Sequence, residues 1–186
     1  MTKKITAPLD KTAIVKLEAG DEVLLSGEIY TSRDAGHKRM IEQIEKGEEL
    51  PFNIKDAVIY YVGPSPNKPG EIIGSAGPTT SYRMDAYTPK LLDSGLSGMI
   101  GKGDRNEDVI QSMIKNKAVY FAAVGGAAAL ISDKIVSSEI IAYEDLGTEA
   151  LRRLIVKDFP CIVVIDSEGH DLYKSEKVKY RITNNE

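Results

Sequence analysis

Three short segments of this chain combine glycine, hydroxyl and basic residues in a way that suits the binding of a small acid. The most distinctive is Gly77–Asp85, with the sequence GPTTSYRMD. Glycine and proline fix the backbone of the turn. The guanidinium offers two parallel donors to a carboxylate, and the hydroxyls and turn amides can fill its remaining lone pairs. The segment therefore predicts a carboxylate-binding site.

The other two segments are Thr31–Asp34 (TSRD) and Gly101–Gly103 (GKG). Glycines that flank a lysine let the backbone approach an anion, while the ammonium adds a point charge. The GKG segment lacks the full G-x-x-x-x-G-K-[ST] pattern, which excludes a nucleotide P-loop. Together, Arg33, Arg83 and Lys102 predict a site for an acid with more than one carboxylate.

Each of these residues also has an ordinary structural interpretation. Arg83 could pair with Asp85, and Arg33 with Asp34. A lone histidine such as His37, one turn into the helix expected after Arg33, is more often structural than catalytic.

The two threonines and the glycine-rich runs have structural alternatives as well. Thr79 and Thr80 either bind a ligand or only cap and turn the backbone. Gly101–Gly103 alone could be a simple turn. The run Gly125–Ala129 favours close packing over phosphate binding.

Metal-ligating residues are sparse. Cys161 is the only cysteine, and it lies in the apolar run Phe159–Ile165, which predicts a buried, inert thiol. It cannot form an internal disulfide or hold a cysteine-ligated cluster alone. His37 and His170 are far apart in sequence, so we expect no metal site in this chain. Anion-binding groups without metal ligands or a complete triad indicate half of an active site.

Composition narrows the class of protein. The chain has 186 residues, 42% of them hydrophobic, which suits one domain with its own core. The net charge is −4, and basic residues are scattered among acidic ones, so we expect no nucleic-acid partner. The sequence has no apolar run of the roughly 18 residues that span a membrane, and no signal-peptide core near Met1. We therefore expect a cytoplasmic protein.

The hydrophobic pattern predicts an α/β fold with mixed sheets, in a single domain over residues 1–186 whose tail, 181–186, frays. Helices are expected over Asp34–Gly47 and Thr88–Gly95, and after a cap at Asn106. Strands are expected over Ala13–Leu17, Glu22–Tyr30, Val58–Val62, Glu71–Ala76, Met99–Ile100, Val119–Val124, Ile140–Tyr143, Leu151–Val156 and Cys161–Ile165.

The order of three motifs resembles a known family. Thr31–Arg39, Gly77–Asp85 and Ile100–Gly103 resemble the class I, iron–sulfur-dependent fumarate hydratases, specifically the β subunit of the two-subunit form. That subunit corresponds to the C-terminal domain of the single-chain enzymes. The L-tartrate dehydratase β subunit shares the pattern. The resemblance covers about Leu25 to Tyr173.

The resemblance implies a three-layer β/β/α swivelling domain that closes over an α subunit. In the family, the α subunit holds a 4Fe-4S cluster on three cysteines, and the open iron acts as a Lewis acid on the substrate. The implied activity is the reversible hydration of fumarate to L-malate, a tricarboxylic acid cycle reaction, by the complex only. The isolated chain could form a homodimer.

The resemblance also implies roles for single residues. The substrate-binding residues would be Arg33, Thr80, Arg83 and Lys102. Thr79 matches the threonine with a proton-transfer role in the family, although an unperturbed hydroxyl is a poor base. Asp34 and His37 would hold the substrate-binding residues in place without binding the substrate themselves.

The substrate and the kind of function stay open at this stage. Arg83–Thr88 is more similar to the fumarase version, and Ser32 stands where the tartrate type tends to have cysteine. L-Malate and L-tartrate differ by one hydroxyl, and a site distinguishes them only through its contacts with that group. Two rivals remain: a non-catalytic module that binds small dicarboxylates, and a scaffold subunit whose arginines stabilise a heteromer.

Overall fold

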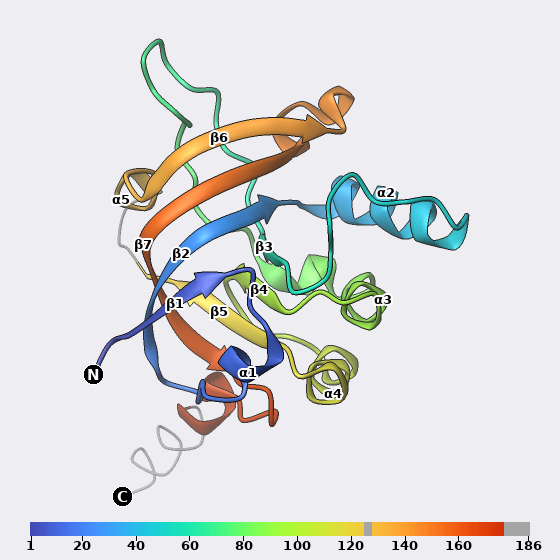
Figure 1. Ribbon diagram of the computed structural model, residues 1–186, viewed down its shortest axis with the longest axis vertical. Coiled ribbons are helices and arrows are strands. Elements are labelled where there is room, and N and C mark those ends of the chain that lie inside the picture. The colour runs from blue at the N-terminus through green and yellow to red at the C-terminus, as the bar shows by residue number, and fades with distance from the viewer. Residues whose placement is uncertain (125–127, 177–186) are drawn as a thin grey trace, which may run out of the picture.

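The computed structural model describes residues 1–124 and 128–176, with the elements labelled in Figure 1. Its strands are β1 Lys3–Ala7, β2 Glu22–Thr31, β3 Val58–Tyr60, β4 Gly98–Gly101, β5 Val119–Ala123, β6 Ile135–Ala142 and β7 Leu151–Ile165. Its helices are α1 Lys11–Ile14, α2 Asp34–Glu45, α3 Thr88–Asp93, α4 Glu107–Asn116, α5 Ala128–Ser132 and the 3₁₀ helices η1 Ser81–Met84 and η2 Glu144–Glu149. The predicted frayed tail and part of the Gly125–Ala129 run lie outside the described residues.

The strands of the described chain form one mixed sheet in the order β1-β2-β3-β4-β5-β7-β6. Strands β1 to β5 run parallel to their neighbours. The long strand β7 is antiparallel to β2, β5 and β6. Because β7 pairs with both β2 and β5, the sheet closes on itself, and β1 and β6 flank the closed part. The predicted α/β class and mixed pairing are confirmed.

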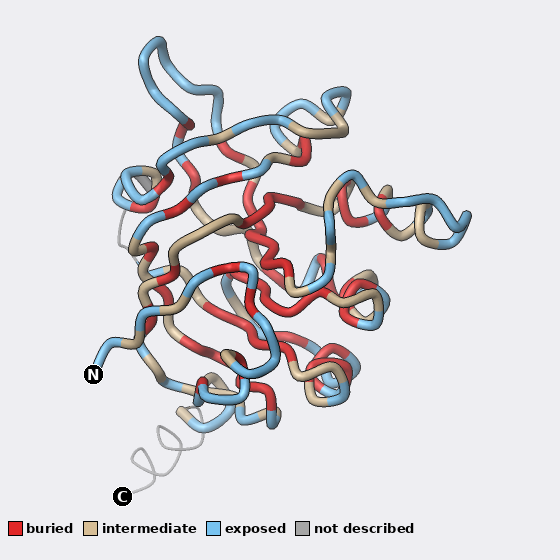
Figure 2. The backbone as a smooth tube through the Cα atoms, viewed as in Figure 1, coloured by how far each residue is buried: buried red, intermediate tan, exposed pale blue. Residues whose placement is uncertain are grey.

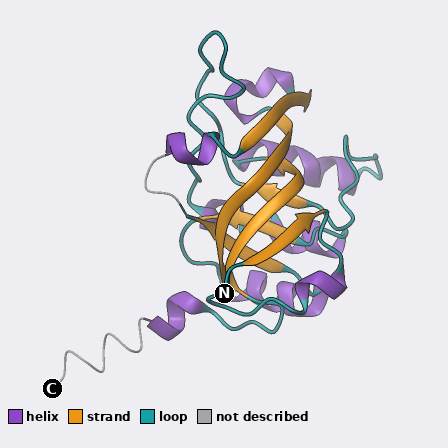
Figure 3. Ribbon diagram, turned by 60° about the vertical axis from the view of Figure 1, so that its left-hand side comes forward, coloured by secondary structure: helices purple, strands orange, loops and turns teal. Residues whose placement is uncertain are grey.

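Two hydrophobic cores lie on opposite faces of the central strands. The first contains residues from all the strands of the closed part, such as Leu25, Tyr60 and Phe159. The second lies between the sheet and helices α2, α3 and α4, and Ile59 and Met113 belong to it. Figure 2 shows this burial along the middle strands, and Figure 3 shows the strands crossing the molecule between peripheral helices. Consecutive residues of β3 thus face different cores, as is usual for parallel strands covered on both sides.

Two predicted strands are wrong. Over Ala13–Leu17 the chain forms the end of α1 and a turn, and the Asp10 side chain caps that helix by accepting a hydrogen bond from the Ala13 amide at 2.9 Å. Glu71–Ala76 lies in an irregular loop between β3 and η1, which doubles back so that the Ser65 amide bonds the Ser75 carbonyl. Its apolar residue Ile73 fills the first core without forming a strand.

Two predicted strands are instead one. β7 runs through both Leu151–Val156 and Cys161–Ile165. Pro160 lies within β7 opposite Leu24, and Asp158 absorbs the bend with a left-handed φ of 49°. The strand can therefore reach both β6 and β5, which closes the sheet.

The predicted helices are confirmed, with differences at their ends. Asn106 caps α4 by accepting a hydrogen bond from the Val109 amide at 2.9 Å, as expected. Tyr87, and not Thr88, occupies the N-cap position of α3. The Thr88 hydroxyl instead donates to the Met84 carbonyl. No helix among residues 1–124 and 128–176 has the length and apolar character that a membrane span requires.

Candidate functional site

The candidate site lies where the parallel strands β2, β3 and β4 end. Arg33 follows β2, and Lys102 follows β4 directly. Tyr61 follows β3, between them. Loops that follow neighbouring parallel strands emerge at the same edge of a sheet, which is where ligands bind in many α/β folds. The topology therefore gathers segments that are far apart in the sequence.

The threonine motif lies between the ends of β3 and β4. The Thr79 amide donates to the Tyr61 carbonyl at 2.7 Å, and the Ser81 amide donates to the Lys102 carbonyl at 2.9 Å. Thr80 forms a parallel bridge with Lys102. These backbone bonds act like a short extra strand and hold both threonines, half-buried, at the edge.

Close packing explains one of the glycines beside Lys102. A Cβ at Gly101 would lie 2.1 Å from the Ser81 Oγ and 2.8 Å from a Tyr61 ring carbon. Only glycine fits between these two side chains. The GKG segment thus lets the Ser81 backbone approach β4, and it leaves the Lys102 side chain exposed.

Arg83 lies on η1 and faces the start of α2. Its Nη2 atom is 2.5 Å from the Asp34 Oδ2, and its side chain remains 45% exposed. The pair with Asp85 that the sequence left open does not form among the described residues, because Asp85 pairs with Arg105. The ion pair brings the second and first sequence motifs into contact.

Arg33 reaches across the edge to the end of η2. Its Nε atom is 3.3 Å from the Glu149 Oε1. A Cβ at Gly63 would lie 3.0 Å from the Arg33 Cδ and Nη1 atoms, so the glycine gives this side chain room to lie flat. The alternative pair with Asp34 is not formed within the described part of the chain, because Asp34 binds Arg83.

Lys102 and Thr79 differ from the two arginines. In residues 1–124 and 128–176, the Lys102 ammonium forms no ion pair, and the Thr79 hydroxyl forms no hydrogen bond. The carboxylates of the site thus neutralise the arginines and not the lysine.

His37 is fully buried behind Arg33. Its Nδ1 atom lies 2.9 Å from both the Arg33 carbonyl and the Ser32 Oγ. Because a carbonyl only accepts, the hydrogen-bond network assigns the proton to Nδ1. Burial lowers the pKa of His37 to about 4, so the ring is neutral near pH 7. The ring packs edge-on against Tyr61, with centroids 5.2 Å apart.

Buried polar atoms without hydrogen-bond partners gather near this edge. Of those found in the described chain, four belong to Arg33 (Nε), Asp34 (Oδ1), His37 (Nε2) and Tyr61 (hydroxyl). Burying a polar atom without a partner costs about 1–3 kcal/mol. Native structures keep few such atoms, and strain, a catalytic role, a bound water or an ion commonly accounts for them.

Sequence reasoning missed the partners that hold the site residues in place. Glu149 comes from a distant helix, and no local pattern marks it. Arg105 lies three residues after Lys102, but nothing in its neighbourhood showed that its side chain would be fully buried on Asp85. Tyr120 lies on a predicted strand, and its hydroxyl reaches the Ser81 Oγ at 2.8 Å. The motifs predicted Arg33, Thr79, Arg83 and Lys102, which the structure places at this edge.

The residues present do not fit an iron–sulfur cluster. The chain has one cysteine, Cys161, and clusters of this kind need several thiolates. Its side chain lies in the first core, and burial raises the pKa of the thiol above its ordinary value. No group of three or more His, Cys, Asp or Glu side chains in the described residues could hold a metal ion. The predicted inert thiol agrees with this position.

The fold and the site define an α/β domain with a cationic edge at the carboxyl ends of its parallel strands. The chain belongs to the family described as Fumarase C-terminus, which matches residues 2–176. Relatives in this family are named as hydratases and dehydratases.

Relatives of two lengths are similar to this chain. It is 39% identical over 152 residues to "Fumarate hydratase class I, aerobic" from Escherichia coli K12, which covers 81% of this chain and 28% of that protein. It is 33% identical over 175 residues to "Putative fumarate hydratase class I" from Geobacillus stearothermophilus, covering 91% of this chain and 33% of that protein. The chain thus spans about a third or less of these longer relatives.

A shorter relative matches end to end. "Putative L(+)-tartrate dehydratase subunit beta" from Methanocaldococcus jannaschii is 35% identical over 177 residues, which cover 92% of this chain and 91% of that protein. The same domain therefore occurs both as a separate chain and as part of a longer one.

Proposed function

We propose that this chain is the carboxylate-binding β subunit of an iron–sulfur hydro-lyase that interconverts fumarate and L-malate. One observation carries the proposal: Arg33, Thr79, Arg83 and Lys102 lie at one edge of the sheet in a member of the fumarase C-terminus family. The activity belongs to a complex with an α subunit, and not to this chain alone.

The cations of the site suit a dicarboxylate. Arg33, Arg83 and Lys102 face two carboxylates of the chain, Asp34 and Glu149, which leaves one positive charge unbalanced. A guanidinium has five N–H donors, so its partner leaves several free for a ligand. Two arginines that can each bind a carboxylate with two parallel hydrogen bonds, plus a lysine point charge, match the two ends of a small diacid.

Thr79 is the proposed proton carrier. Hydration of fumarate adds a proton to one alkene carbon and hydroxide to the other, so a side chain must deliver or remove that proton. A hydroxyl at its ordinary pKa is a poor base and needs a neighbour to activate it. The backbone of Thr79 is fixed on the Tyr61 carbonyl, which holds its hydroxyl at the edge. We place the activating group on the α subunit.

The partner subunit would supply the cofactor. A 4Fe-4S cluster with an open iron provides Lewis-acid chemistry toward the hydroxyl and carboxylate of the substrate. Cys161 cannot ligate it here, because the thiol is single and buried. The M. jannaschii relative, named as a β subunit of similar length, supports a separate α chain.

We also propose that the chain is a three-layer β/β/α swivelling domain. The two cores on opposite faces of β3, β4 and β5 support the layering. A domain that closes over the α subunit would bring the cationic edge onto the substrate and exclude water from it.

The tartrate reaction is the second candidate. The end-to-end relative from M. jannaschii is named for L(+)-tartrate, whereas the longer relatives are named for fumarate. The site residues bind carboxylates, which both substrates carry. Specificity for L-malate or L-tartrate would therefore depend on the residues that contact the extra hydroxyl of tartrate.

The test is reconstitution. The chain is mixed anaerobically with the cluster-loaded α subunit from the same organism, and fumarate absorbance is followed with L-malate, while L-tartrate turnover is measured separately. We expect fumarate from L-malate. Turnover of L-tartrate alone would overturn the fumarase assignment and keep the hydro-lyase mechanism. A stable complex with an intact cluster and no turnover would leave a dicarboxylate-binding or scaffold subunit.

A further inference from the structure

Arg105 is a buried arginine that the proposed chemistry does not use. Its side chain is fully buried beneath the candidate site, between Lys102 and the start of α4. A buried charge is costly unless it is paired and hydrogen-bonded. Burial alone would lower the pKa of the guanidinium, but the Tyr61 and Asp85 side chains raise it above its ordinary value. The side chain is therefore a cation held inside the protein.

The contacts of Arg105 join two of the site segments. Its Nε donates to the Asp85 Oδ1 at 2.7 Å, and its Nη2 donates to the Thr88 Oγ1 at 2.8 Å. The Asp85 Oδ2 accepts from the Asn106 amide at 2.8 Å. Asp85 lies two residues after Arg83, and Arg105 lies three after Lys102. The pair thus ties the backbone that carries one cation to the backbone that carries the other.

Two tyrosine rings, Tyr61 and Tyr120, also contact the Arg105 guanidinium. The Arg105 guanidinium lies 5.3 Å from the ring centre of Tyr61 and 5.0 Å from that of Tyr120. The Tyr120 hydroxyl donates to the Gly103 carbonyl at 2.9 Å, so the Ser81 Oγ, 2.8 Å away, is the donor to Tyr120. Contacts between a cation and aromatic rings are strongest when they are shielded from water, as they are here. Arg105 therefore supports the segments on both sides of Lys102.

We propose that Arg105 is a positioning residue that sets the separation between Arg83 and Lys102. The inference rests on the proposed function, in which both cations bind one dicarboxylate. The Arg105 side chain has no exposed surface with which to bind a ligand, so it would act through Asp85 and Tyr120. The affinity for a ligand with two carboxylates depends on the distance between the two cations. The affinity for a monocarboxylate does not, because it binds only one of them.

Two variants test the proposal, with one control. Arg105→Lys keeps the charge but cannot bind Asp85 and Thr88 in the same geometry. Arg105→Met removes the charge and leaves Asp85 buried without its partner. Met113→Ala is the control, because Met113 is buried on α4 in the second core, and the hydrogen bonds that the described residues form with Asp85 and Arg105 do not include its side chain. We expect this variant to lower the melting temperature, as a large-to-small core substitution does, and to keep the hydrogen bonds of Arg105.

The first measurement is amide hydrogen exchange in the full chain. The Ser81 amide bonds the Lys102 carbonyl, so its protection reports whether the two segments stay together. We expect Ser81 exchange at least tenfold faster in Arg105→Lys, relative to the amides of the core strands. In Met113→Ala this ratio should stay within threefold of wild type. Unchanged Ser81 protection in Arg105→Lys overturns the inference, whatever the complex does.

The second measurement compares succinate and propionate as inhibitors of the reconstituted complex. In Arg105→Lys we expect the inhibition constant to rise at least tenfold for succinate and less than threefold for propionate. Arg105→Met, where it folds, should show the same pattern. Equal losses for both acids, or no loss for succinate, overturn the inference. A wild-type complex that neither turns over malate nor binds succinate refutes the proposed function instead.

Discussion

The cations of the candidate site differ in how far each is neutralised by the chain itself. Arg83 is paired with Asp34 and is 45% exposed, and Arg33 is paired with Glu149 and is 26% exposed. Lys102 is exposed and forms no ion pair with any described residue. Partial neutralisation keeps the arginines in fixed directions while several of their donors remain open to a ligand.

Replacement of Arg83 by alanine should reduce kcat/KM strongly. Loss of a hydrogen-bonded contact to a charged group costs about 2–3 kcal/mol, or roughly 30- to 150-fold. The measurement is steady-state kinetics of the reconstituted complex. Arg39→Ala is the matched control, because Arg39 lies on α2, whose Asp34 pairs with Arg83, and forms its own ion pair with Asp145. A near-normal kcat/KM in Arg83→Ala would show that Arg83 does not bind the substrate.

Thr79 and Thr80 are neighbours with different predicted roles. Thr79→Val keeps the shape and removes the hydroxyl, so we expect kcat to fall by about tenfold or more with KM almost unchanged. Thr80→Val, at a predicted binding residue, should raise KM instead. If Thr79→Val changed only KM, the residue would bind the substrate and would not carry the proton.

His37 predicts a dependence of stability on pH. Its pKa is about 4 in the folded chain and 6.5 ordinarily, so the unfolded state binds the proton more readily. The stability associated with neutral His37 is therefore fully present above pH 6.5, is lost as pH falls toward 4, and amounts to about 3 kcal/mol. Urea unfolding at several pH values gives the change of unfolding free energy with pH. His37→Asn should lose the part of this change that falls between pH 6.5 and 4. His170→Asn, at an exposed histidine, should keep it. Identical slopes in the two variants would contradict the assignment.

At the scale of elements, the site depends on how closely η1 approaches β4. Gly101 is the contact point, because a Cβ there would lie 2.1 Å from the Ser81 Oγ. In Gly101→Ala the Ser81 and Tyr61 side chains must therefore shift, and we expect η1, with Arg83, to move away from Lys102. We expect a loss of about 1–3 kcal/mol in unfolding free energy and a raised KM for the dicarboxylate.

The control for Gly101→Ala is a glycine in open space. A Cβ at Gly47 meets no atom within 4 Å, and only its φ of 71° is unfavourable. Gly47→Ala should cost about 1–2 kcal/mol by chemical denaturation and leave KM unchanged. If Gly101→Ala left KM unchanged as well, the position of η1 would not matter for binding.

The elements also show what the sequence could and could not predict. Strong local signals gave β2 and α4, whose cap at Asn106 is confirmed. Glu71–Ala76 has the composition of a strand, but the loop bonds to itself and not to a neighbouring strand. Strand propensity describes how residues suit a half-buried surface, and it does not supply a partner strand.

The site itself was predictable only where chemistry and local turns coincide. The motifs located Arg33, Arg83 and Lys102, because basic residues at element ends are recognisable from neighbouring residues. Their partners Glu149 and Arg105 depend on which distant segments the closed sheet brings together. Pairings of that kind depend on topology, which one sequence does not reveal.

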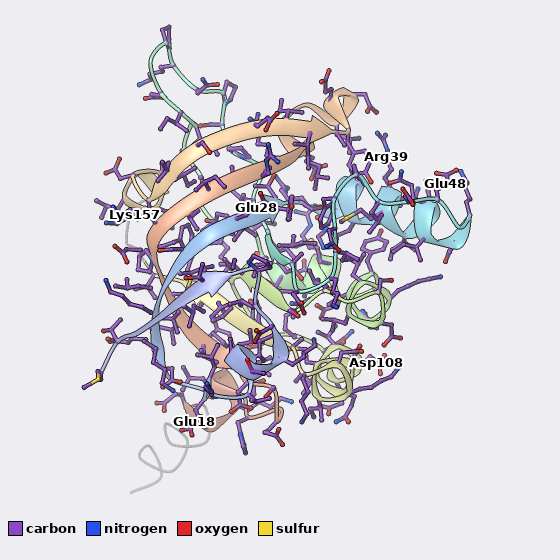
Figure 4. All side chains as sticks on the ribbon, in the orientation of Figure 1. Glu18, Glu28, Arg39, Glu48, Asp108 and Lys157 are labelled. Carbon is purple, nitrogen blue, oxygen red and sulfur yellow. The ribbon has the colours of Figure 1, made fainter. Side chains whose placement is uncertain are left out.

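At the scale of the whole molecule, charge is spread over the surface. The net charge is −4, and charged side chains of both signs occur on different sides of the protein, as the labelled Glu18, Glu28, Arg39, Glu48, Asp108 and Lys157 illustrate (Figure 4). The cationic edge is thus a local feature of a mildly acidic protein. In the proposed function, local focusing of charge of this kind would attract and orient the dicarboxylate.

In the proposed reaction this chain binds the carboxylates and the α subunit holds the cluster. Cys161, as the single cysteine, offers a test of that arrangement. The thiol is 2% exposed within the first core, and burial raises its pKa, so it is protonated and out of reach of iron. Anaerobic treatment of the chain alone with iron and sulfide should give no cluster absorbance. The complex with Cys161→Ala should keep its activity within about twofold, since the cavity left by one sulfur affects stability and not the edge of the sheet. Cluster absorbance in the isolated chain that disappears in Cys161→Ala would contradict this arrangement, and would require the ring of strands to open around the thiol.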